Sequence, residues 1–240
     1  MPAVLAVLML ILAPGAQAAC RQALALGLDV SGSVDAREYR LQLDGLAGAL
    51  LHPDVQGAFL AIPGAPVDLL VYEWSGLGPQ RNLIPWTAIA TPGDLAKIAA
   101  TLAATGRIAS EPPTAIGQAM LAGARRLRER PECTRLTLDL SGDGKSNTGP
   151  RPRDVKAEAL LDGITVNALV IGPVQQRPIE IADLWGYFST EVIRGPQAFV
   201  EVALGFEDFE NAMARKLLKE LQTAAVSERL PIRPSRHARR

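Results

Sequence analysis

The chain has 240 residues, of which 48% are hydrophobic and 21% are charged, and its formal net charge at pH 7 is zero. This length and balance are typical of one globular domain with a sizeable core. The neutral net charge gives no general indication of nucleic acid as a partner, and we expect none.

The amino-terminal segment is typical of a secretory signal peptide. Residues 3–13 are almost wholly apolar, and Ala16-Gln17-Ala18 follows as a small-residue cleavage motif. The apolar stretch is too short to span a bilayer comfortably. We therefore expect residues 1–19 to be a signal peptide, the protein to be exported (periplasmic or secreted), and the mature chain to have no membrane span.

The sequence contains two cysteines, Cys20 and Cys133, and each lies just before an apolar run typical of a strand. If the two strands are parallel neighbours, both cysteines lie at the same edge of the sheet. The alternative is two unrelated buried thiols. An exported protein folds where disulfides persist, so we favour a Cys20–Cys133 disulfide.

Apolar runs alternate along the chain with segments of helical periodicity. The predicted strands are 24–30, 66–74, 81–86, 136–140, 164–171 and 198–203, and the predicted helices are 36–51, 93–104, 114–130, 154–161, 178–188 and 206–221. This alternation predicts an α/β fold: a doubly wound, mostly parallel six-stranded sheet with helices on both faces. The second and third strands are close enough to form a hairpin, which would supply one antiparallel edge strand. We expect residues 20–224 to form this domain and residues 225–240 to form a basic, disordered tail.

The first predicted strand ends in Asp29-Val30-Ser31-Gly32-Ser33. Ligand sites in open α/β sheets form at the carboxyl ends of the strands. One carboxylate and two hydroxyls at alternate positions form a hard-oxygen set, which suits Mg²⁺ or Mn²⁺ better than zinc or copper. The alternative is a helix cap, because Ser and Asp are common there.

Two later loops carry further oxygen-bearing side chains. Thr114 opens a predicted helix, and Asp143 lies in Ser141-Gly142-Asp143-Gly144 directly after a predicted strand. Each has a simpler explanation when taken alone, since Thr114 can cap the helix and Asp143 can stabilise a turn. If the strands before Asp29 and Asp143 are neighbours, however, both carboxylates lie at one edge of the sheet.

These motifs, in this order and on this topology, resemble the metal-ion-dependent adhesion site (MIDAS) of the von Willebrand factor A domain family. The resemblance covers roughly residues 22–222. It implies that Ser31 and Ser33 bind the metal directly and that Thr114 binds directly or through water. It also implies that Asp29 and Asp143 act directly or through water and supply negative charge. One coordination position would remain for an acidic side chain of a protein partner.

Other segments are similar to an exported bacterial subgroup of A-domain proteins of unknown function. These are Val71-Tyr72-Glu73-Trp74-Ser75-Gly76, Gln80-Arg81 with Pro85-Trp86-Thr87, and Ser141-Gly142-Asp143-Gly144. Two acidic residues stay open at this point. Glu73 lies near the end of its strand and can join the rim of the site, while Asp139 either supports the site or bonds beneath a helix.

The resulting hypothesis is a binding module with no catalytic residues. One alternative is a hydrolase of the haloacid dehalogenase type, which also places an Asp after the first strand and a later Gly-Asp motif for Mg²⁺. Those phosphatases carry a second acid two positions after the first, whereas this chain has Ser31, which cannot act as a general acid. The other alternative is a structural module with a vestigial site.

Overall fold

The computed structural model describes residues 20–172 and 178–228. Its centre is a six-stranded sheet in the order β3-β2-β1-β4-β5-β6. The strands are β1 (Gln22–Asp29), β2 (Val67–Trp74), β3 (Asn82–Ile89), β4 (Leu136–Gly142), β5 (Ile164–Gly172) and β6 (Val200–Leu204). All neighbouring strands are parallel except β2 and β3, so β3 is an antiparallel edge strand. The predicted fold class is confirmed.

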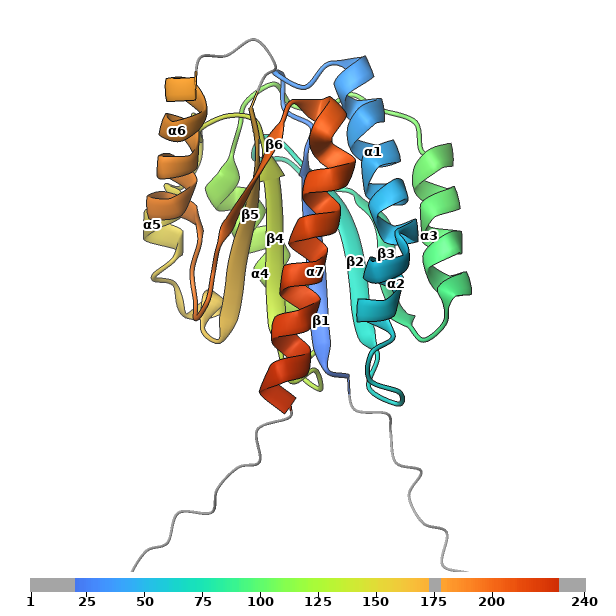
Figure 1. The fold of residues 1–240 in the computed structure, drawn as a ribbon. Coiled ribbons are helices and arrows are strands. Elements are labelled where there is room, and N and C mark those ends of the chain that lie inside the picture. The colour runs from blue at the N-terminus through green and yellow to red at the C-terminus, as the bar shows by residue number, and fades with distance from the viewer. Residues whose placement is uncertain (1–19, 173–177, 229–240) are drawn as a thin grey trace, which may run out of the picture.

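Helices cover both faces of the sheet (Figure 1). One face packs against α1 (Ala36–Leu51), α2 (Pro53–Phe59), α3 (Pro92–Ala104) and α7 (Phe209–Glu228). The other packs against α4 (Ile116–Leu127), α5 (Pro152–Val155) and α6 (Pro178–Tyr187). Short helical turns at Ala159–Leu161, Phe188–Val192 and Phe206–Asp208 complete the chain order. The four inner strands are therefore buried on both sides, as their nearly continuous apolar sequences predict.

β1 is the central strand that fixes the first residue of the candidate site. All of its residues are buried, because it lies between β2 and β4 and beneath helices on both faces. On the α4 face a Cβ at Gly27 would lie 2.7 Å from both Leu140 Cδ2 and Tyr72 Cζ, so only glycine leaves room for this packing. This close packing holds the end of β1, and with it Asp29, in one position.

The helix boundaries differ from the sequence predictions in several places. Pro53 ends α1 as expected, but it also opens α2 at its first turn, where a missing N–H costs nothing. The helix predicted over 154–161 is divided into α5 and the turn Ala159–Leu161. The domain boundary expected at residue 224 falls inside α7, which continues to Glu228. Residues 229–240 of the expected tail lie outside the described residues.

The amino edge of the sheet carries a disulfide between Cys20 and Cys133. β1 and β4 are parallel neighbours, and the Thr134 N–H donates to Cys20 O at 2.9 Å, so the two cysteines meet as expected. The expected signal peptide, residues 1–19, lies outside the described residues. Within residues 20–172 and 178–228, no helix has both the length and the apolar character needed to cross a membrane.

Candidate metal centre

Three loops meet at the carboxyl edge of the sheet. They follow β1, precede α4 and follow β4. Because β1 and β4 pair in parallel, with Gly27 opposite Leu140, Asp29 and Asp143 emerge beside each other. The backbone N–H of Gly32 donates to Pro112 O at 2.8 Å and joins the first loop to the second.

The side chains of Asp29, Ser31, Ser33, Thr114 and Asp143 form one connected cluster. The Thr114 hydroxyl donates to Ser31 Oγ at 3.2 Å, and Ser31 Oγ lies 3.4 Å from Ser33 Oγ. The Ser33 hydroxyl donates to Asp143 Oδ1 at 2.7 Å, and the Ser31 N–H donates to Asp29 Oδ1 at 2.8 Å. The structure therefore brings together every residue that the sequence singles out as a metal ligand.

Thr114 lies outside the helix that it was expected to open. α4 begins at Ile116 with Ala115 at the N-cap position, and no side chain caps it there. The Thr114 hydroxyl is directed at Ser31 instead. The simpler explanation of Thr114 as a helix cap is therefore wrong, and its hydroxyl belongs to the cluster.

Within the cluster, the negative charge of Asp29 has an unfavourable environment. Its side chain is completely buried, and its Oδ2 atom has no hydrogen-bond partner in the described part of the chain. Burial, and then the nearby charge of Asp143, raise the pKa of Asp29 to about 7. Burial also raises the pKa of Asp143. Because these two buried carboxylates repel each other, a cation bound between them would stabilise both in the charged form.

The donor set fits a hard divalent cation. It combines neutral hydroxyls with two carboxylates, and these oxygen donors suit Mg²⁺ or Mn²⁺. A Cβ at Gly142 would lie 3.3 Å from the unpartnered Oδ2 of Asp29, so glycine keeps this side of the carboxylate open. A buried oxygen without a partner and the glycine beside it are features expected of a cation site.

Gln42 of α1 supports the candidate centre through hydrogen bonds, a role that was not predicted from the sequence. Its side chain is buried, and its amide nitrogen donates to Asp29 O at 3.0 Å. Its amide oxygen accepts a hydrogen bond from Ser141 Oγ at 3.1 Å. One signal was available, because Gln42 lies in the apolar stripe of the helix beside Tyr39 and Leu43, where a polar residue needs a partner.

Asn147 holds Thr114 from the loop that follows β4. The Thr114 N–H donates to Asn147 Oδ1 at 2.9 Å, and the Asn147 N–H donates to Thr114 O at the same distance. Ser146 adds a hydroxyl bond to Thr114 O at 3.2 Å. These bonds join two of the three loops, a role that no local sequence pattern indicated.

Two acidic residues left open by the sequence have distinct positions. Asp139 pairs with Lys216 Nζ at 2.7 Å beneath α7, so its role is structural. Glu73 lines a cavity beside the centre, together with Val30. A separate group of possible ligands, formed by Cys20, Asp68 and Cys133, is not a metal site here because both sulfurs are in the disulfide.

A family model described as "Protein of unknown function (DUF1194)" matches residues 19–225. The chain belongs to the DUF1194 family. A search of the curated proteins finds no match to this DUF1194 chain.

Solved structures that the DUF1194 chain resembles in fold include von Willebrand A-type proteins. A von Willebrand factor type A protein from Catenulispora acidiphila has a TM-score of 0.50 and 16% identity, over 85% of this chain and 43% of that chain. The pilus adhesin SpaC from Lactobacillus rhamnosus GG has a TM-score of 0.59 and 14% identity, over 84% and 31%.

Proximal thread matrix protein 1 from the mussel byssus, in a form with a zinc-occupied MIDAS motif, has a TM-score of 0.55 and 15% identity. The match covers 85% of this chain and 47% of that chain. The DUF1194 chain thus spans about half the length of the mussel protein and less of the adhesin. These identities establish the fold alone.

Proposed function

We propose that this protein binds a protein partner through a divalent cation held at the candidate metal centre. Asp29, Ser31, Ser33, Thr114 and Asp143 would hold Mg²⁺ or Mn²⁺, in the manner of a MIDAS. The bound cation would supply positive charge for an acidic side chain of the partner. The proposal depends chiefly on the convergence of these five side chains around the buried, unpartnered Oδ2 of Asp29.

We also propose that the protein acts outside the cytoplasm. The apolar segment 3–13 is typical of a secretory signal, and the disulfide suits an oxidising compartment. The names of similar structures, a pilus adhesin and a byssus matrix protein, support an adhesive role.

Binding without turnover is favoured over phosphatase chemistry. A nucleophilic aspartate must present its carboxylate to the substrate, whereas Asp29 has no exposed surface. Ser31, two positions later, offers no acid to protonate a leaving group. Hydrolysis of p-nitrophenyl phosphate that needs Mg²⁺ and disappears in Asp29→Asn would contradict this part of the proposal.

The test is thermal melting of the protein in EDTA, Mg²⁺ and Mn²⁺. A cation that binds only the folded state stabilises it by about 2.7 kcal/mol at 100 times its dissociation constant. The parent should melt at a higher temperature in millimolar Mg²⁺, whereas Asp29→Asn should not respond. In EDTA Asp29→Asn should be at least as stable as the parent, because it removes a buried charge that faces Asp143.

Glu129→Gln is the matched control, because it removes an exposed carboxylate just beyond α4. This variant should keep the full response to metal. The proposal fails if the parent shows no rise in either metal, or if Asp29→Asn and the parent rise equally.

A further inference from the structure

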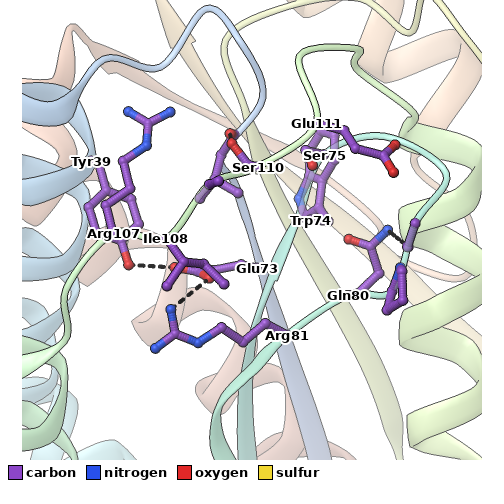
Figure 2. A pocket seen from close by; sticks show the side chains of 14 residues that line it. Tyr39, Glu73, Trp74, Ser75, Gln80, Arg81, Arg107, Ile108, Ser110 and Glu111 are labelled. Atoms are coloured by element: carbon purple, nitrogen blue, oxygen red, sulfur yellow. Dashed lines mark hydrogen bonds and ion pairs between the residues drawn. The ribbon is translucent and has the colours of Figure 1, made fainter.

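A cavity of about 200 Å³ lies beside the metal centre. Its walls come from α1, the end of β2, the turn before β3 and the segment 107–111 (Figure 2). Tyr39, Glu73, Arg81 and Arg107 form its charged and aromatic part. None of these side chains takes part in the cation cluster.

The carboxylate of Glu73 at this cavity is already satisfied. The Tyr39 hydroxyl donates to Glu73 Oε1 at 2.5 Å, and Arg81 Nη1 lies 3.6 Å from Glu73 Oε2. Arg81 also donates to Gly106 O at 3.3 Å. Both Arg81 contacts are long, so its guanidinium retains donors for a stronger acceptor.

Arg107 is the less engaged of the two arginines. It is partly buried, and its guanidinium lies over the Tyr39 ring at 5.7 Å from the centroid. Within the described residues it makes no hydrogen bond. In Figure 2 its guanidinium points away from the Glu73–Arg81 pair. A partly desolvated guanidinium with all its N–H donors free binds an anion more strongly than a fully exposed one does.

The other carboxylate at the cavity does not compete for these arginines. Glu111 Oε2 accepts the Leu77 N–H at 2.8 Å. Figure 2 shows Glu111 on the opposite side of the cavity from Arg107. On the arginine side, Arg81 and Arg107 face the single carboxylate of Glu73, so this side is locally positive although the whole chain is neutral.

The cavity and the metal centre share a wall. Val30 lines the cavity and stands between Asp29 and Ser31 in the chain. The Ser110 hydroxyl, from the segment 107–111, donates to Val30 O at 2.6 Å. The two sites are therefore adjacent at the carboxyl end of β1.

We propose that this cavity is a second anion site, which takes another carboxylate from the same acidic peptide segment that binds at the metal centre. Arg107 and Arg81 supply charge-assisted hydrogen bonds to that carboxylate. The adjacent Ile108 side chain, 54% exposed, offers apolar contact to the segment. This inference rests on the proposed function, and it narrows the partner to a segment with at least two acidic side chains close together.

The test uses a tetraglutamate peptide as the probe and acetate as the single-carboxylate comparison. With Mg²⁺ present, calorimetric titration of the purified protein should show that tetraglutamate binds more tightly than acetate. Arg107→Gln should weaken tetraglutamate binding about tenfold, since it removes a charge-assisted contact. The same variant should keep the parent's affinity for Mg²⁺ measured without peptide.

Arg81→Gln is a second variant of the same site, and it should also weaken tetraglutamate binding. Arg125→Gln is the matched control, because it removes an exposed arginine on α4 outside this cavity. It should bind tetraglutamate as the parent does. Higher salt should weaken the parent's binding more than that of Arg107→Gln, because the arginine contact is ionic.

The outcomes separate the two proposals. If EDTA or Asp29→Asn leaves tetraglutamate binding unchanged, the metal-dependent function fails. If binding needs Mg²⁺ but Arg107→Gln and Arg81→Gln match the parent, the second anion site fails and the metal-dependent function stands. If the parent binds tetraglutamate no better than acetate, the second site is likewise overturned.

Discussion

The side-chain oxygen of Gln42 accepts a hydrogen bond from the Ser141 hydroxyl at 3.1 Å, although 99 residues separate the two in the chain. The same amide donates to Asp29 O, so one residue of α1 ties the ends of β1 and β4 together. These ends carry both carboxylates of the candidate centre. The spacing of the carboxylates thus depends on a residue outside the cluster of five oxygen-bearing side chains.

The first prediction concerns this link. Gln42→Met keeps the side-chain volume but leaves the buried Asp29 carbonyl without its partner, which should lower the free energy of unfolding by about 1–3 kcal/mol. It should also reduce the melting shift in Mg²⁺. Gln56→Met is the control, because its bond to Leu51 O is exposed, and it should cost less than about 0.5 kcal/mol. Equal losses of stability in urea unfolding would contradict the buried role of Gln42.

The second prediction concerns Asn147, which fixes Thr114 through two reciprocal bonds. Asn147→Ala should raise the apparent Mg²⁺ dissociation constant about tenfold, the typical effect of losing a residue that orients a ligand. Calorimetric titration with Mg²⁺ measures this constant. Asn82→Ala is the control: it removes a hydrogen bond from Arg126 at the start of the edge strand. It should leave the Mg²⁺ dissociation constant unchanged. If both variants bind Mg²⁺ equally well, Thr114 does not need this support.

The third prediction concerns the buried charges beneath α7. Lys216 Nζ lies 2.7 Å from both Asp139 and Glu220, and Asn167 donates to Glu220 at 2.7 Å. Lys216→Met leaves two buried carboxylates without their cation, which should cost about 3–5 kcal/mol at pH 7.5. Urea unfolding measures this loss.

The loss in Lys216→Met should shrink as the pH falls. Burial raises the pKa of Asp139, and Lys216 opposes that rise. The parent therefore also gains stability as the pH falls. Without Lys216 the pKa of Asp139 in the native state rises further, so the variant gains more stability than the parent on going from pH 7.5 to pH 5.5. Lys219→Met, an exposed neighbour, should cost less than about 1 kcal/mol at either pH. A loss for Lys216→Met that stays constant with pH would show that the buried carboxylates do not cause it.

The fourth prediction concerns the disulfide, which joins residues 113 positions apart. Reduction, or the pair Cys20→Ser and Cys133→Ser, should lower the free energy of unfolding by about 2–5 kcal/mol, since the cross-link restricts the unfolded chain. The melting shift in Mg²⁺ should persist, because the disulfide lies at the edge of the sheet opposite the metal centre. Urea midpoints with and without reductant test the first part, and a midpoint that does not move would contradict it.

Most of the fold could be predicted because its signals are local. The apolar runs predict buried parallel strands, and Pro53 marks the end of α1. The cluster residues could be named because Asp29, Ser31 and Ser33 follow one strand and Asp143 follows its neighbour. α2 was missed because a proline that ends one helix also begins the next.

The supporting residues could not be predicted in the same way, because their partners are distant in sequence. Lys216 and Glu220 have the spacing of an exposed ion pair on a helix, yet α7 buries both against Asp139. The cavity beside the centre depends on how the turn after β2 and the segment 107–111 fold back over Tyr39. No periodicity or short motif encodes such a meeting of loops.

The disulfide has a mechanical consequence for the proposed binding function. Cys20 begins the described domain and is bonded to Cys133, just ahead of β4. Tension applied at Cys20 would therefore be shared between β1 and β4 rather than carried by β1 alone. Both strands lead to the loops of the metal centre at the far edge. A load between Cys20 and a ligand at the centre would then run lengthwise along β1 and β4.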